Sequence, residues 1–202
     1  MALYHFSVRH VSRGKGQMVI ASAAYISGQR IFDSYYNKIH DYTSKSGVVF
    51  TEILTPEYVP ERLTDRETLW NEVEHVERNN KAQLAYSFDI ALQNELTLEE
   101  NIRLAKEFCQ EQFVARGMIV DLAIHEGKSD NEEEPDNPHF HVLVPIRPFT
   151  EEGIWGNKQR REYILDEDGN RVKDAKGKEM FNAVSTTGWN DPELLKEWRR
   201  DR

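Results

Sequence analysis

The chain has 202 residues, of which 39% are hydrophobic and 30% charged, a composition that allows a sizeable core and excludes a disordered chain. Its formal net charge of −9 argues against an indiscriminate nucleic-acid binder, although basic residues cluster in several loops. The chain has no apolar run long enough to span a bilayer, no secretory signal pattern at its N-terminus and a single cysteine. We therefore predict a cytoplasmic protein without membrane insertion.

Predicted strands and helices alternate along the first part of the chain. Residues 3–11 alternate apolar and polar side chains and predict a strand, whereas residues 18–32 have helical spacing. Residues 35–46 are polar and irregular, and residues 47–54 predict a second strand. The segment from Thr64 to Glu67 has the Thr-x-x-Glu order that begins a helix.

The alternation continues through the second part of the chain and then becomes less regular. Residues 82–92 predict a strand in which every second side chain is apolar. Thr97-Leu98-Glu99-Glu100 predicts a capped helix that stops near Gly117. Two further strands are predicted at residues 118–126 and 139–147, joined by an acidic loop at 127–137. A small exposed hairpin at residues 163–170 and a charged helix at Pro192–Arg202 are predicted to follow.

This order of elements predicts an α+β fold, with an antiparallel or mixed sheet that carries helices on one face and the candidate site on the other. We expect a single domain over residues 1–202, in which residues 3–147 form the core and residues 148–202 form a C-terminal appendage. The charged helix ends abruptly at Arg202, which indicates the N-terminal part of a longer protein.

Two histidines in one strand are the most informative feature. His139 and His141 are two residues apart, so their side chains leave the same face of the predicted strand. His125 closes the preceding strand and completes three protein ligands with an open position. The alternation of residues 84–92 adds Asp89 to that face. The same pattern also occurs as surface alternation without a metal.

Tyr25 is the tyrosine with the most distinctive surroundings. It lies in a predicted helix among small residues, Ala21-Ser22-Ala23-Ala24, that would let the helix pack tightly while the phenol reaches outward. Taken alone, this pattern favours a core aromatic on an amphipathic helix over a nucleophile.

An ordered set of short segments resembles the relaxases of the MobA/MobL family, plasmid mobilisation enzymes of the HUH endonuclease superfamily. The His-x-His pattern is generic, but the set covers most of residues 3–147 in order, which makes the resemblance specific. The matching segments are Tyr4 to Phe6, Ala21 to Tyr25, Arg66 to Trp70, Ala91 to Leu96, Gly117 to Asp121 and Asn137 to His141.

The resemblance implies an enzyme that nicks one strand of plasmid DNA at an origin of transfer. Tyr25 would become joined to the 5′ phosphate and leave a free 3′ hydroxyl, while His125, His139 and His141 would hold Mn²⁺ or Mg²⁺. Implied partners are the single-stranded origin with its adjacent hairpin, accessory relaxosome proteins and a type IV coupling protein. Relatives often carry Arg-Glu where this chain has Tyr86-Ser87. That departure leaves Asp89 to orient a ligand histidine, to help deprotonate the tyrosine, or only to bond a loop amide.

Candidate DNA contacts are less readable. Trp155 would either stack on a base or anchor a loop. The basic candidates for phosphate contacts, from the N-terminal loop and from the C-terminal appendage, are Arg9, Arg13, Lys15, Lys158, Arg160 and Arg161.

Three other functions remain open from the sequence. A rolling-circle replication initiator would use the same fold and chemistry, although the tyrosine usually follows the histidines there. A metal-dependent phosphodiesterase would activate water and would survive replacement of Tyr25 by Phe. A catalytically silent module would bind hairpin DNA without metal-dependent cleavage.

Overall fold

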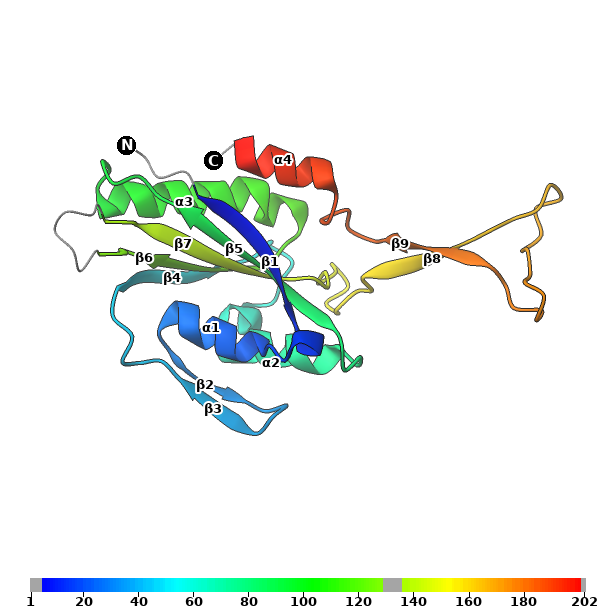
Figure 1. The fold of residues 1–202 in the computed structure, drawn as a ribbon, viewed down its shortest axis with the longest axis horizontal. Helices are drawn as coiled ribbons and strands as arrows, with labels where there is room; N and C mark the ends of the chain where they lie inside the picture. The colour runs from blue at the N-terminus through cyan, green and yellow to red at the C-terminus, as the bar shows by residue number, and fades with distance from the viewer. Residues whose placement is uncertain (1–4, 129–135, 201–202) are drawn as a thin grey trace. The chain divides into compact units, whose positions relative to one another are not determined.

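The computed structural model describes residues 5–128 and 136–200. Among these residues the main sheet has five strands in the order β1-β5-β7-β6-β4, and each neighbouring pair is antiparallel (Figure 1). The predicted α+β class is confirmed. The strands are β1 (Phe6–Ser12), β4 (Val48–Leu54), β5 (Gln83–Ala91), β6 (Val120–His125) and β7 (His139–Pro145).

Helix α3 (Leu98–Gln112) covers one face of this sheet (Figure 1). The ring of Phe108 in α3 contacts Phe140 of β7, and Phe113 just beyond the helix contacts Phe88 of β5. The helix begins with the predicted capping box, in which Thr97 accepts from the Glu100 amide and Glu100 accepts in return from the Thr97 amide.

The other face of the sheet carries the histidines and is also covered by helices. Helices α1 (Val19–Ser27) and α2 (Arg66–Val76) lie on this side (Figure 1), where Ala23 and Ala24 pack into one core cluster with Ala123 and Leu143. The prediction placed helices on one face only. The sheet needs a cover here because its surface beyond the histidines is apolar.

Helix α1 ends earlier than predicted, at Ser27. Gly28 follows in the left-handed conformation, with φ 63°, and stops the helix. A short hairpin replaces both the predicted last turn and the segment predicted to be irregular. Its strands are β2 (Arg30–Asp33) and β3 (Lys38–Asp41), and Asp33 shapes the turn by accepting the amides of Tyr35 and Tyr36.

Helix α2 begins one residue later than the Thr-x-x-Glu pattern predicted. Thr64 ends the short helix η2 (Glu61–Thr64), and Asp65 caps α2 by accepting the Thr68 amide at 2.8 Å. The other short helices are η1 (Arg13–Lys15) and η3 (Val114–Arg116).

The chain forms two compact units, the first ending at Trp155 and the second beginning at Gly156. The second contains β8 (Gln159–Tyr163) paired with β9 (Phe181–Ser185), and α4 (Pro192–Arg200). The hairpin predicted at residues 163–170 is part of this longer one. The start of the predicted first strand and most of the acidic loop, residues 1–4 and 129–135, lie outside the described residues. No helix in the described part is long and apolar enough to cross a membrane.

Candidate active site

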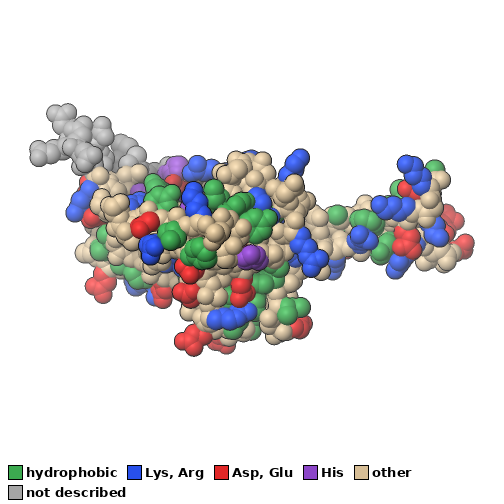
Figure 2. All heavy atoms as spheres, turned by 90° about the horizontal axis from the view of Figure 1, so that it is seen from below, with side chains coloured by type: hydrophobic (Ala, Val, Ile, Leu, Met, Phe, Trp, Pro, Cys, Tyr) green, Lys and Arg blue, Asp and Glu red, His purple; other side chains and the backbone are tan. Residues whose placement is uncertain are grey.

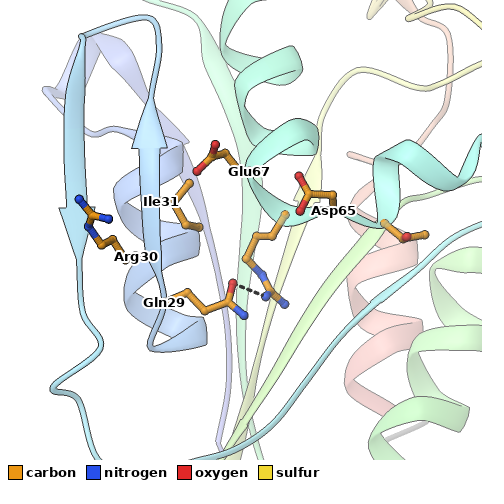
Figure 3. Close-up of a pocket in the computed structure, with 7 residues that line it drawn as sticks. Gln29, Arg30, Ile31, Asp65 and Glu67 are labelled. Atoms are coloured by element: carbon orange, nitrogen blue, oxygen red, sulfur yellow. Dashed lines mark hydrogen bonds between the residues drawn. The ribbon is translucent and has the colours of Figure 1, made fainter.

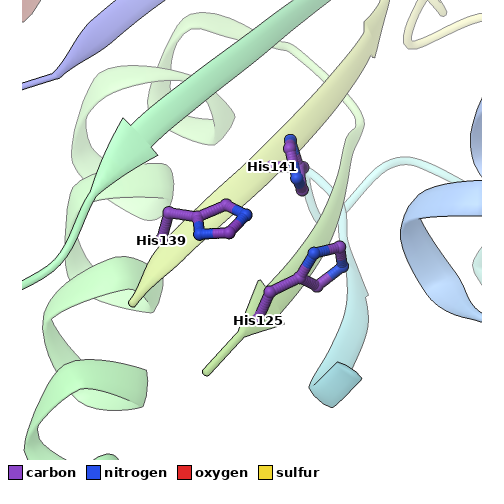
Figure 4. A group of neighbouring side chains, drawn as sticks. All are labelled: His125, His139 and His141. Carbon is purple, nitrogen blue, oxygen red and sulfur yellow. The ribbon is translucent and has the colours of Figure 1, made fainter. Parts of the chain in front are cut away.

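Three histidines from two adjacent strands lie together on the sheet face that α1 covers. His125 at the end of β6 is paired in register with His139 at the start of β7, and His141 follows two residues later (Figure 4). Their ring centroids are 4.7 to 5.2 Å apart. One nitrogen from each ring lies within 4.8 Å of the other two, so the three could hold one metal ion.

Backbone carbonyls fix the orientation of two of these rings. His125 Nε2 lies 2.7 Å from the Ile26 carbonyl oxygen, and His139 Nδ1 lies 2.7 Å from that of Asn137. Because a carbonyl can only accept, these nitrogens carry the protons. The lone pairs are therefore on His125 Nδ1 and His139 Nε2. Such outer hydrogen bonds are typical of histidines that ligate metals.

The surroundings of His125 and His141 favour their neutral forms. Burial, the other two histidines, Lys45 and Arg9 together lower the pKa of His141 to about 3. Burial is also the largest cause that lowers the pKa of His125. Neutral imidazole is the form that binds metals, so this donor set fits a divalent cation.

Asp89 lies on the neighbouring strand β5, directly opposite His141 in the register. Cross-strand partners share a face of the sheet, so its carboxylate is on the histidine side. Its charge opposes the lowering of the pKa of His125. The role predicted for Asp89, to orient a ligand or accept a proton, stays a prediction.

Tyr25 lies in the last turn of α1, and its side chain is 49% exposed. It is therefore not the core aromatic that the helical pattern alone favoured. Its ring meets the ring of Tyr42 edge-on at 5.4 Å, and the Lys45 ammonium lies 3.7 Å from the ring centroid. The next residue along the chain is Ile26, whose carbonyl oxygen holds His125. One hydrogen bond thus connects the tyrosine's helix to the histidine group.

A family model for the MobA/MobL family matches residues 17–201. The chain belongs to the MobA/MobL family. It is 35% identical to the conjugal transfer protein TraA of Agrobacterium fabrum over 202 residues, which is 94% of this chain and 18% of that protein. It is 36% identical to a probable mobilization protein MobA of Bifidobacterium longum over 174 residues, 85% of this chain and 30% of that protein. The chain thus spans less than a third of the length of either relative.

A solved structure concerned with the molecular basis of vancomycin resistance transfer in Staphylococcus aureus has the same fold. Its TM-score is 0.78 at 35% sequence identity, and the match covers 98% of this chain and 88% of that chain. The resemblance inferred from the sequence is therefore confirmed.

Two of the segments that carry the MobA/MobL resemblance meet in the core. The fully buried Asp121 of β6 accepts two hydrogen bonds from Arg66 Nε at 3.0 Å and one from Arg66 Nη2 at 2.8 Å. The Trp70 indole donates to the same carboxylate at 2.8 Å. These hydrogen bonds join the segments 66–70 and 117–121 and hold α2 against the sheet.

Two of the residues predicted to contact DNA have hydrogen-bond partners within the protein. The buried Arg13 guanidinium donates to the Glu74 carboxylate at 2.8 and 2.9 Å and to the carbonyls of Glu74, Glu77 and Asn79. Arg13 is therefore not among the DNA contacts that we propose. The Trp155 indole donates to Glu72 at 2.9 Å and forms a T-shaped contact with Phe149, which favours the loop-anchor alternative.

The other predicted DNA contacts are distributed over both units. Arg9 lies on β1, on the histidine side, and Lys15 is exposed in η1. In the second unit Arg160 pairs with Glu162, and Arg161 lies over the ring of Phe181 at 4.6 Å. Figure 2 shows acidic side chains interspersed with the basic ones there. Lys158 is half-buried in the same unit.

A separate hollow of about 410 Å³ opens at the start of α2 (Figure 3). Gln29 accepts from Arg66 within it at 2.8 Å, and Asp65 and Glu67 line its rim. Arg30 and Arg66 line it as well, so the charges of its lining balance and we assign no DNA contact to this hollow.

Sequence reasoning missed Lys45, which contacts Tyr25. It lies in the polar stretch predicted to be irregular, where no periodic pattern marks a site. Only the fold reveals this contact.

Proposed function

We propose that this chain is a relaxase domain that nicks single-stranded plasmid DNA at an origin of transfer and so initiates conjugative mobilisation. The observation that carries the proposal is a group of three histidines, one of which is hydrogen-bonded to the backbone carbonyl of the residue that follows an exposed tyrosine. Membership of the MobA/MobL family supports it, since the curated relatives are named conjugal transfer and mobilization proteins.

The proposed reaction is a transesterification. Tyr25 Oη bonds to the scissile phosphorus as the bond from phosphorus to the 3′ oxygen breaks, which gives a 5′-phosphotyrosyl adduct and a free 3′ hydroxyl. The phenol proton leaves through solvent or Asp89, and the 3′ oxygen takes up a proton. His125, His139 and His141 would hold Mn²⁺ or Mg²⁺, which when bound would neutralise charge on the scissile phosphate.

The proposed partners follow from the same function. We propose single-stranded DNA with an adjacent hairpin as the substrate, and accessory relaxosome proteins and a type IV coupling protein as partners in the cytoplasm. The basic residues that we propose as phosphate contacts are Arg9, Lys15, Lys158, Arg160 and Arg161.

The test uses labelled single strands that tile the DNA flanking the gene of this protein. Wild type, Tyr25→Phe and Tyr36→Phe are incubated with Mn²⁺ or EDTA and separated on denaturing protein gels. Tyr36 is a matched control because its side chain is also exposed, at 41%. We expect a metal-dependent covalent band in wild type and Tyr36→Phe that is absent from Tyr25→Phe.

Other outcomes would point to other functions. Metal-dependent cleavage that persists in Tyr25→Phe would make activated water the nucleophile, as in a phosphodiesterase. Binding without cleavage by any variant would favour a silent DNA-binding module. An adduct formed only on DNA from a replication origin would favour a rolling-circle initiator.

A further inference from the structure

Lys45 contacts Tyr25 at two points. Its ammonium nitrogen donates to the Tyr25 carbonyl oxygen at 3.0 Å and lies 3.7 Å from the centroid of the same residue's ring. A cation this close to the face of a tyrosine ring is attracted by the negative charge of the π face. The backbone contact fixes where the cation sits, so the ring cannot swing away without losing it.

The Lys45 ammonium has no carboxylate partner in the part of the chain that the structure describes. The side chain is half-buried, so its charge is partly removed from water. A half-buried charge without a carboxylate partner lowers the stability of the folded chain, since it is partly desolvated. Fold stability alone does not account for it.

A short turn after β3 places Lys45 next to Tyr25. The Tyr42 amide donates to the Gln29 carbonyl at 3.1 Å, and the Lys45 amide donates to the Tyr42 carbonyl at 2.9 Å. The turn thereby holds the Tyr42 ring in a T-shaped contact with the Tyr25 ring and the Lys45 ammonium over the face of Tyr25. The exposed nucleophile candidate is thus constrained on two sides, although its side chain is half open to solvent.

We propose that Lys45 is a positioning residue for Tyr25. It holds the ring in one orientation and stabilises the negative charge that develops on the phenol oxygen as that oxygen attacks phosphorus. This inference rests on the proposed function, because it concerns the same nucleophile. It assigns Lys45 to the chemical step and not to DNA affinity.

The experiment compares wild type with Lys45→Met, Lys45→Arg and Lys38→Met. Met removes the charge, Arg keeps a cation that can lie over the ring, and Lys38 is an exposed lysine of β3. Single-turnover adduct formation at saturating oligonucleotide and the dissociation constant of the same oligonucleotide are measured for each. NMR of the Tyr25 ring protons, without DNA or metal, reports the contact itself.

We expect Lys45→Met to slow adduct formation about tenfold at saturation with an unchanged dissociation constant, and to shift the Tyr25 ring resonances. Lys45→Arg should recover most of the rate, and Lys38→Met should match wild type. A normal rate at saturation, or a loss confined to the dissociation constant, would overturn the positioning role while leaving the proposed function intact. Absence of any adduct in wild type would instead overturn the proposed function, and the role of Lys45 with it.

Discussion

Each of two histidines in the site uses one ring nitrogen to bind a backbone carbonyl. His125 and His139 are therefore already turned with their lone pairs away from those carbonyls, whereas His141 is kept neutral by burial and by its charged neighbours. At the scale of single residues, this geometry suits a metal site, because the three histidines would need little rearrangement to bind an ion.

Removal of one ligand should abolish tight metal binding. His139→Ala should weaken Mn²⁺ binding by at least about 100-fold, because two protein ligands replace three. Isothermal titration calorimetry with MnCl₂ measures this without DNA. His75→Ala is the control, since that histidine contacts Ser34 and lies on α2 outside the group. Equal affinity of His139→Ala and wild type would contradict the metal site.

The buried carboxylate of Asp121 should matter for folding. Asp121→Asn leaves the Arg66 guanidinium buried with a neutral partner and should lower the free energy of unfolding by about 3–5 kcal/mol. Urea denaturation followed by circular dichroism measures the change. Glu107→Gln removes the partner of the exposed Arg103 and should cost less than about 1 kcal/mol. Similar losses in both variants would contradict a special role for the buried pair.

At the scale of elements, the sequence predicted the strands and helices that have a clear periodic or capping pattern. All five strands of the main sheet were predicted, β1 and β5 from their alternation of apolar and polar side chains, and a capping box identified the start of α3. The β2–β3 hairpin was missed because its strands are only four residues long and one of them continues the helical spacing of α1. Strand order and register could not be predicted from the sequence either, since they depend on contacts between distant segments.

The candidate site was likewise predictable only in part. The three histidines could be predicted because strand parity places them on one face. The burial of Arg13 could not be predicted, because its partner Glu74 lies on α2, far away in the sequence. The contact of Lys45 with Tyr25 likewise depends on the turn after β3.

A single methyl group added at Gly127, just after β6, should weaken the binding of metal. Gly127 has φ 56°, and a Cβ there would overlap the backbone carbonyl of Asn137, which orients His139. Gly127→Ala should therefore weaken Mn²⁺ affinity about 10–100-fold, as loss of an outer hydrogen bond does. Gly169→Ala, with φ 81° and open space around it, should keep wild-type affinity. Titration calorimetry separates the two, and unchanged affinity in Gly127→Ala would contradict the orienting role of Asn137.

At the scale of the whole molecule, a net charge of −9 must be reconciled with the proposed nucleic-acid substrate. Contacts with phosphates are local, so a few basic side chains can provide them while the remaining surface repels DNA and limits non-specific binding.

Removal of the proposed contacts in the second unit should change the salt dependence of DNA binding. Neutralising Lys158, Arg160 and Arg161 to Gln should lower the slope of log affinity against log salt by about 2, since each single-strand phosphate contact contributes about 0.7. Fluorescence anisotropy over a salt series measures the slope. The control neutralises Arg103 and Lys106 on α3, which are paired with Glu107 and Glu52. Equal slopes in wild type and the triple variant would remove these residues from the interface.

The central position of β7 in the sheet affects how readily this strand opens to solvent. The strand that carries His139 and His141 is the third of the five described strands and is hydrogen-bonded on both sides. Its amides should exchange with deuterated water only in the rarest openings, close to global unfolding, whereas edge strands and turns exchange sooner. We therefore expect the proposed metal ion and DNA to bind and dissociate without opening of β7.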